Sequence, residues 1–151
     1  MNETQSIKES LVYLQSWASQ FAPSVVFRPS ANTSAIENFL EKSGLTLPED
    51  LCQYLRVTDG ETRASAGMIG NWRLMPLEEI QAAWGLLDKF IEKGAFSEQK
   101  PENSPYLRES WWHPKWVPVV TNDEGDYFCL DTDPPDPSRF EQVILYLQNQ
   151  P

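Results

Sequence analysis

The stretch WVPVVTNDEGDYFCLDTDPPDP, residues 116–137, combines two runs of β-forming residues with a cluster of acidic side chains. WVPVV and DYFCLD are rich in β-branched and aromatic residues, and TNDEG between them supplies the Gly, Asn and Asp that favour a tight connection between strands. We therefore predict a β-hairpin, with carboxylates at its tip, at the two ends of its second strand and beyond that strand: Asp123, Glu124, Asp126, Asp131, Asp133 and Asp136. Three interpretations of these carboxylates are open: a metal site, an acid/base pair, or the polar rim of a binding surface.

The N-terminal part of the chain predicts two amphipathic helices. Ser6 and Glu9 have the spacing of a capping box, and apolar residues recur at helical intervals over residues 6–21: Ile7, Leu11, Leu14, Trp17 and Phe21. Ser34 and Glu37 repeat the capping-box spacing ahead of a second helix.

The middle of the chain predicts two more helices around a short strand. LPEDLCQYLRVTDGE, residues 47–61, has Pro48 at a position suited to the start of a helix. MIGNWRLMP, residues 68–76, has strand spacing, and residues 76–94 repeat apolar side chains at intervals of three and four. We expect two tryptophans of this region in the core: Trp72 and Trp84. Residues 95–115 show no sustained periodicity, which favours a long surface loop.

Length and composition are typical of one acidic domain. The chain has 151 residues, with 12 basic and 22 acidic residues and a net charge of -10. This charge opposes binding to nucleic acids and anionic membranes and favours basic protein partners. We find no signal peptide or membrane-spanning run, so we expect a cytoplasmic protein. Cys52 and Cys129 lack CxxC spacing, and we expect both as buried thiols.

The hairpin does not match a calcium-binding loop. Asn122, Glu124 and Asp126 alternate as ligands would, but Tyr127 stands where an EF-hand requires glycine, and strands rather than helices flank the loop. We therefore predict no metal and no cofactor.

Catalysis has little support in the sequence. Asp131 and Asp133 share a strand face, as an acid/base pair could, but polar residues at a strand end need no catalytic explanation. His113 is the only histidine, and neither Cys129 nor any serine lies in a nucleophile motif. We expect no enzyme and no catalytic residue, with a small hydrolase using His113 or the Asp131/Asp133 pair as the weakest alternative.

Four blocks occur in a fixed order along the chain: LPEDLCQYLRVTDGE (47–61), NWRLMPLEEIQAAW (71–84), WWHPKWVPVVTNDEGDYFCLDTDP (111–134) and FEQVILYL (140–147). Together, over about residues 27–147, they resemble the SUKH superfamily, the Smi/Knr-like proteins. The chain departs from the family pattern at Phe140–Glu141, where glycine is common. Family members usually continue into a helix that packs on the sheet, whereas this sequence ends at Pro151. Either the N-terminal helices cover that face or the chain is a shortened form.

The resemblance implies an α+β fold with a mixed, largely antiparallel sheet and helices packed around it. We expect residues 1–151 to form a single SUKH-like domain, with the family core at about 27–147 and an N-terminal helix at 6–21. Bacterial members are regarded as immunity proteins that neutralise a cognate toxin, often a nuclease or deaminase. Fungal relatives act in cell-wall regulation through protein partners. The resemblance implies a non-enzymatic module, either an immunity protein or a regulator or scaffold with an endogenous partner.

An acidic inhibitor can occupy the basic groove with which a nuclease binds phosphates, and exposed aromatic side chains can anchor the contact. On this basis we predict the partner-binding residues Asp123, Glu124, Asp126, Asp131, Asp133, Trp111 and Trp112. For the two tryptophans, packing in the core is an equally open interpretation. The sequence does not indicate the oligomeric state.

Overall fold

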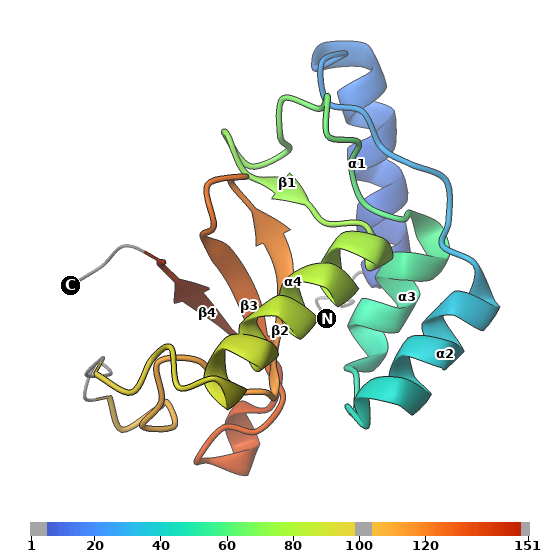
Figure 1. Cartoon of the computed structure of the whole chain (residues 1–151). Coiled ribbons are helices and arrows are strands. Elements are labelled where there is room, and N and C mark those ends of the chain that lie inside the picture. Colours follow the sequence, from blue (N-terminus) through green and yellow to red (C-terminus); the bar gives the residue numbers. More distant parts are fainter. Residues whose placement is uncertain (1–5, 99–103, 149–151) are drawn as a thin grey trace. The chain divides into compact units, whose positions relative to one another are not determined.

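The computed structural model describes residues 6–98 and 104–148, and the chain falls into two compact units, Met1–Leu77 and Glu78–Pro151 (Figure 1). The first unit contains α1 (Ile7–Phe21), α2 (Thr33–Ser43), α3 (Glu49–Val57) and β1 (Arg73–Leu74). The second contains nearly all of α4 (Leu77–Glu92), then β2 (Trp116–Thr121), β3 (Tyr127–Asp131), the 3-10 helix η1 (Pro137–Arg139) and β4 (Gln142–Tyr146). The predicted α+β class is confirmed. That residues 1–151 form one domain stays a prediction.

The capping box predicted for α1 is present. The Glu9 N–H donates to Ser6 Oγ at 3.2 Å, and the Ser6 N–H donates to the Glu9 carboxylate at 3.1 Å. In α2 the predicted Ser34–Glu37 box is wrong. Asn32 occupies the cap position, and its Oδ1 accepts the Ser34 N–H at 2.8 Å. Asn caps a helix as well as Ser does, so the helix begins one residue before Ser34.

The segment after α3 is held by polar contacts within the first unit. The Tyr54 hydroxyl donates to the Met75 carbonyl at 3.1 Å, and the buried Glu61 carboxylate accepts the Leu74 N–H at 2.6 Å. Gly60 adopts a φ of 72°, and a Cβ there would lie 2.6 Å from the Met75 carbonyl carbon. The turn therefore requires glycine for both its backbone conformation and its close approach to the chain at β1.

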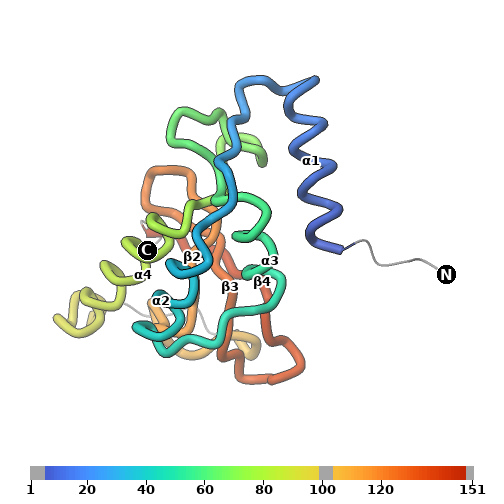
Figure 2. Tube along the Cα trace, turned by 90° about the vertical axis from the view of Figure 1, so that its right-hand side faces the viewer, coloured from blue at the N-terminus to red at the C-terminus, as the bar shows by residue number. Residues whose placement is uncertain are grey.

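The second unit contains an antiparallel arrangement of β2, β3 and β4, which Figure 1 and Figure 2 show as neighbouring strands. Val117 pairs with Leu130 across β2 and β3, so the predicted hairpin is confirmed. β4 pairs with β3, so the sequence block FEQVILYL (140–147) contains a third strand of this arrangement. One buried cluster joins α4, the loop and the strands: Leu87, Trp112, Trp116, Cys129 and Tyr146.

The burial of the two cysteines and two tryptophans, and the extent of the long loop, can be compared with the sequence predictions. Cys52 and Cys129 are free and buried, as predicted. Trp84 is partly buried and packs against this buried cluster, as predicted, whereas Trp72 is partly buried outside it. The Trp84 indole N–H donates to the Pro114 carbonyl at 2.8 Å, which satisfies the polar edge of a ring that packs against the core. The predicted loop is confirmed over residues 104–115, and residues 99–103 lie outside the described part.

The turn before β4 contains Phe140 and Glu141, where glycine is common in the family that the sequence resembles. Glu141 adopts a φ of 71°, in the left-handed region that glycine enters without steric cost. Its N–H donates to the Asp131 carbonyl at 3.0 Å. The chain therefore makes the turn that a glycine would favour, with a glutamate in its place.

Candidate protein-binding surface

The tip of the β2–β3 hairpin is organised by the side chain of Asn122. Its Oδ1 accepts the N–H groups of Glu124 at 2.9 Å and of Asp126 at 3.3 Å, and its Nδ2 donates to Asp126 Oδ2 at 2.9 Å. Asp123 has a φ of 64°, a conformation that Asp tolerates better than most residues. The side chains of Asp123 and Glu124 are exposed on this ordered turn.

Asp126 is a structural residue of the tip. It is partly buried, and its Oδ1 accepts the N–H of Gln148 at 2.9 Å. Both carboxylate oxygens of Asp126 therefore have donors within the chain. The contact also joins the segment after β4 to the hairpin tip.

An apolar strip on β3 and β4 begins beside that tip. The register pairs Phe128 with Leu145 and Leu130 with Val143, so these four side chains lie on one face of the strand pair. Val143 is 63% exposed and Leu145 is 50% exposed, whereas Phe128 and Leu130 are partly buried. We call these four residues the β4 strip. The sequence alone does not predict this strip, because Val143, Ile144 and Leu145 are all apolar and the strand lacks the alternation that distinguishes its faces.

The structure corrects two of the predicted contact residues. Asp131 is fully buried, with Oδ1 accepting the Asp133 N–H at 3.0 Å and Oδ2 accepting the Gln142 side-chain amide at 2.9 Å. Trp112 is also fully buried, and its ring packs edge-on against Trp116 at 5.9 Å and Tyr146 at 5.5 Å between ring centroids. Neither side chain reaches the surface, because the carboxylate completes a turn and the indole fills the core.

Trp111 and Asp133 lie nearer the surface. The Trp111 ring is partly buried, with its centroid 6.4 Å from Phe96 and 6.5 Å from Tyr146. The Asp133 side chain is 44% exposed and forms an ion pair with Arg108 at 3.1 Å. Arg108 also donates its Nε–H to the Asp133 backbone carbonyl at 3.0 Å, so this carboxylate is held against the loop.

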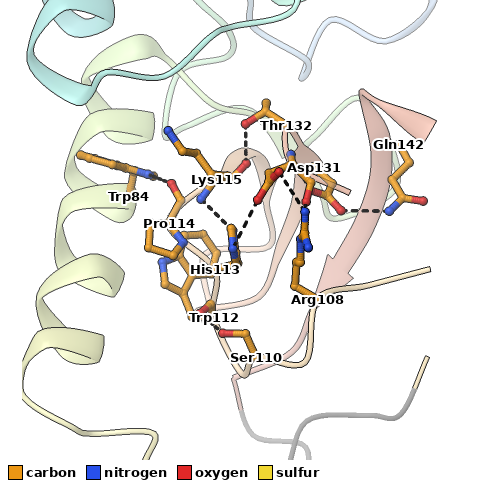
Figure 3. A network of polar contacts seen from close by, with 11 residues as sticks. Trp84, Arg108, Ser110, Trp112, His113, Pro114, Lys115, Asp131, Thr132 and Gln142 are labelled. Carbon is orange, nitrogen blue, oxygen red and sulfur yellow. Dashed lines mark hydrogen bonds and ion pairs between the residues drawn. The ribbon is translucent and has the colours of Figure 1, made fainter. Parts of the chain in front are cut away.

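His113 is part of the same polar network (Figure 3). Its Nδ1 accepts the Lys115 N–H at 3.1 Å, and its Nε2 lies 3.7 Å from Asp133 Oδ2. A ring that accepts through Nδ1 has its proton on Nε2 when neutral. Burial lowers the pKa of His113, and the charges of Asp133 and Asp131 oppose that shift. Both ring nitrogens therefore interact with groups of the chain itself.

A reactive cysteine and a metal site have little basis in the part of the chain that the structure describes. Cys129 is fully buried, and burial followed by the Asp131 charge raises the pKa of its thiol, which disfavours the reactive thiolate. Among residues 6–98 and 104–148, no cluster of three or more His, Cys, Asp or Glu side chains could hold a metal ion. Within those ranges no helix has the length and apolarity needed to cross a membrane.

A comparison with protein families matches the model of the SMI1 / KNR4 family (SUKH-1) to residues 30–151. The chain belongs to this family. Membership confirms the resemblance drawn from the four sequence blocks, and the match begins after α1.

This SUKH-1 chain is also 25% identical over 134 residues to the cell wall biosynthesis/cell cycle regulator smi1 of Schizosaccharomyces pombe. The alignment covers 80% of the SUKH-1 chain but 26% of the yeast protein, so the chain spans about a quarter of that relative's length.

Proposed function

We propose that the chain is a non-enzymatic protein-binding module that neutralises a basic protein toxin, as an immunity protein of the nuclease- or deaminase-directed type. The observation that supports this most is that one hairpin carries two exposed carboxylates, Asp123 and Glu124, on its ordered tip, while the strand paired with it, β4, exposes the apolar side chains of Val143 and Leu145. Membership of the SUKH-1 family supports a regulatory or immunity-type module in general. A cytoplasmic location is part of the proposal.

The two parts of this surface have different physical roles. Exposed carboxylates on a chain of net charge -10 attract a basic partner over a long range and accelerate association. The β4 strip supplies apolar area that is lost from water on contact, which is the main source of affinity. Asp133 and Trp111 lie at the surface farther along the same unit as secondary contacts, whereas Asp131 and Trp112 support the surface from inside.

A regulator or scaffold that binds an endogenous partner is the second candidate. The similarity to the yeast cell wall biosynthesis/cell cycle regulator favours it. The same acidic surface would then bind a basic cellular protein rather than a toxin. The two candidates differ in whether loss of the protein exposes the cell to a toxin encoded nearby.

A hydrolase based on His113 has less support from the geometry. A general base needs a nitrogen that can take a proton from a nucleophile or water, and Nδ1 of His113 accepts a backbone N–H while Nε2 faces Asp133. If His113 were catalytic, His113→Asn would abolish activity even where the fold is retained.

The direct test is co-expression of the chain with the product of an adjacent gene. We expect the toxin expressed alone to stop growth. Co-expression of the wild-type chain or of His113→Asn should restore growth, and each should co-purify with the toxin. The control is Leu86→Glu, which adds a charge at a side chain on α4 that is 52% exposed, comparable to Leu145. Leu145→Glu should lose rescue and Leu86→Glu should retain it. Failure of the unchanged chain to rescue growth or to form a complex would reject the immunity function.

A further inference from the structure

The surface of α1 has three exposed aromatic side chains in one row. Tyr13 is 65% exposed, Trp17 is 40% exposed and Phe21 is 70% exposed. They follow one another at intervals of four residues, so they lie along one face of the helix. The rings of Trp17 and Phe21 are in contact, with centroids 6.1 Å apart. We call these three residues the α1 row.

The α1 row is separate from the side of the helix that is buried. Leu11 and Ala18 are the buried residues of α1, and α1 packs against α3 within the first unit. Sequence periodicity assigned Trp17 and Phe21 to the same stripe as Leu11, but the structure leaves both substantially exposed. Large aromatic side chains that remain in water are typical of contact surfaces rather than of ordinary surface positions.

The charge pattern around the row indicates the kind of partner. Residues 10–27 contain no Asp, Glu, Lys, Arg or His, although the chain has 34 Lys, Arg, Asp and Glu residues in total and a net charge of -10. A basic partner would be attracted to the acidic surfaces elsewhere and gains nothing from the uncharged part of the helix around the α1 row. An anionic membrane repels the chain as a whole, and the helix lacks the basic face that membrane-surface helices use. A second copy of the chain is also acidic, so it can approach closely only where carboxylates are absent.

We propose that the α1 row is the contact surface for a second copy of this chain, in a twofold dimer of antiparallel α1 helices. The row is symmetric about Trp17, since Tyr13 and Phe21 are each four residues away from it. A twofold axis at Trp17 places the two Trp17 side chains together and places Tyr13 of each copy against Phe21 of the other. The row is about 12 Å long at the helical rise, which matches a short helix–helix contact. The surface lies in the first unit and does not depend on the proposed toxin-binding function.

The test is sedimentation velocity on the full chain from about 1 μM to about 100 μM, a range that detects micromolar dimers. We expect a concentration-dependent dimer, and we expect Tyr13→Glu/Phe21→Glu to raise its dissociation constant by about tenfold or more, since aromatic contacts dominate such interfaces. The control is Ile69→Glu/Leu86→Glu, which adds two charges at side chains that are 54% and 52% exposed. This control should dimerise like the unchanged chain.

Circular dichroism of each variant separates loss of the contact from loss of the fold. If the Glu pair reduces helix content, Tyr13→Gln/Phe21→Gln removes the aromatic rings without adding charge and gives the same comparison. An unchanged chain that is monomeric throughout the range overturns the proposal, as does a dimer that persists in both row variants. A monomer that co-sediments with phosphatidylcholine–phosphatidylglycerol vesicles overturns it in favour of a lipid surface.

Discussion

The N–H of Gln148 donates a hydrogen bond to Asp126 Oδ1 at 2.9 Å, which joins the segment after β4 to the tip of the β2–β3 hairpin. Asn122 donates to the other carboxylate oxygen of Asp126 at 2.9 Å. Asp126, one of the predicted surface acids, therefore joins the turn that carries Asp123 and Glu124 to the segment after β4.

Asp126→Ala should destabilise the fold by about 1–2 kcal/mol, because it leaves the Gln148 N–H and the Asn122 side-chain amide without their shared acceptor. Glu124→Ala is the matched control, since it also removes one carboxylate from the tip, but among the described residues that carboxylate accepts no hydrogen bond, and it should change stability by less than about 0.5 kcal/mol. Urea unfolding of the three proteins measures both values. Equal stability of the two variants would show that the Asp126 contacts contribute nothing.

Asp123→Lys/Glu124→Lys should slow association with the basic partner recovered by co-purification, and it should flatten the salt dependence of the association rate. Leu145→Glu should act mainly on dissociation, because it inserts a charge into the apolar part of the contact. Stopped-flow or surface-plasmon measurements at several salt concentrations separate the two effects. Unchanged association rates in the lysine variant would mean that the partner approaches another surface.

Lowering the pH through the unfolded pKa of histidine, about 6.5, should cost the chain stability through His113. Burial lowers the pKa of His113 in the folded chain, so the unfolded chain binds this proton at a higher pH. The stability linked to His113 is therefore fully present above about pH 6.5 and is lost as the pH falls towards the lowered folded value. His113→Asn removes this dependence.

Urea unfolding between about pH 5 and pH 7.5 tests the His113 prediction. The unchanged chain should lose more stability than His113→Asn on acidification. The charged groups that act on the ring, Asp133, Asp131, Arg108 and Lys115, are the same in both proteins, so the difference isolates His113. Parallel pH curves for the two proteins would contradict the predicted shift.

Trp112→Ala should destabilise the fold by about 3–5 kcal/mol, because a fully buried indole leaves a large cavity. Trp111→Ala alters the neighbouring, partly buried ring and should cost clearly less. Trp112→Phe should retain much of the packing, since the Trp112 indole N–H has no hydrogen-bond acceptor among the described residues. Denaturant unfolding of the three variants checks this order, and a larger loss for Trp111→Ala would contradict it.

Glu141→Gly should stabilise the fold by about 0.5–1 kcal/mol. A residue with a side chain pays about 1–2 kcal/mol in the left-handed region, and the greater freedom of glycine in the unfolded chain offsets part of that gain. Glu141→Ala keeps the Cβ and removes the carboxylate, so it separates backbone strain from charge. A thermal unfolding midpoint that rises for both variants equally would assign the effect to the charge.

Local sequence signals determined the elements that depend on neighbouring residues. The Ser6–Glu9 capping box and the hairpin around TNDEG involve groups only a few residues apart, so the residue types and their spacing were sufficient. The α2 cap shows the limit of such signals. Asn32 and Ser34 are both favourable cap residues, and only the structure shows that Asn32 has the extended backbone conformation of the cap position.

The sequence by itself therefore determined the hairpin and the acidic charge of the chain, and its resemblance to a known family implied the α+β class. Only the tertiary structure decided which side chains are available for contact. Trp111 and Trp112 are adjacent in sequence, yet one remains partly exposed and the other is fully buried, because Trp116 and Tyr146 pack around Trp112. Asp123 is exposed, whereas Asp126 is partly buried and accepts a hydrogen bond from Gln148, far along the chain. Burial depends on contacts between distant segments, and no local pattern encodes those contacts.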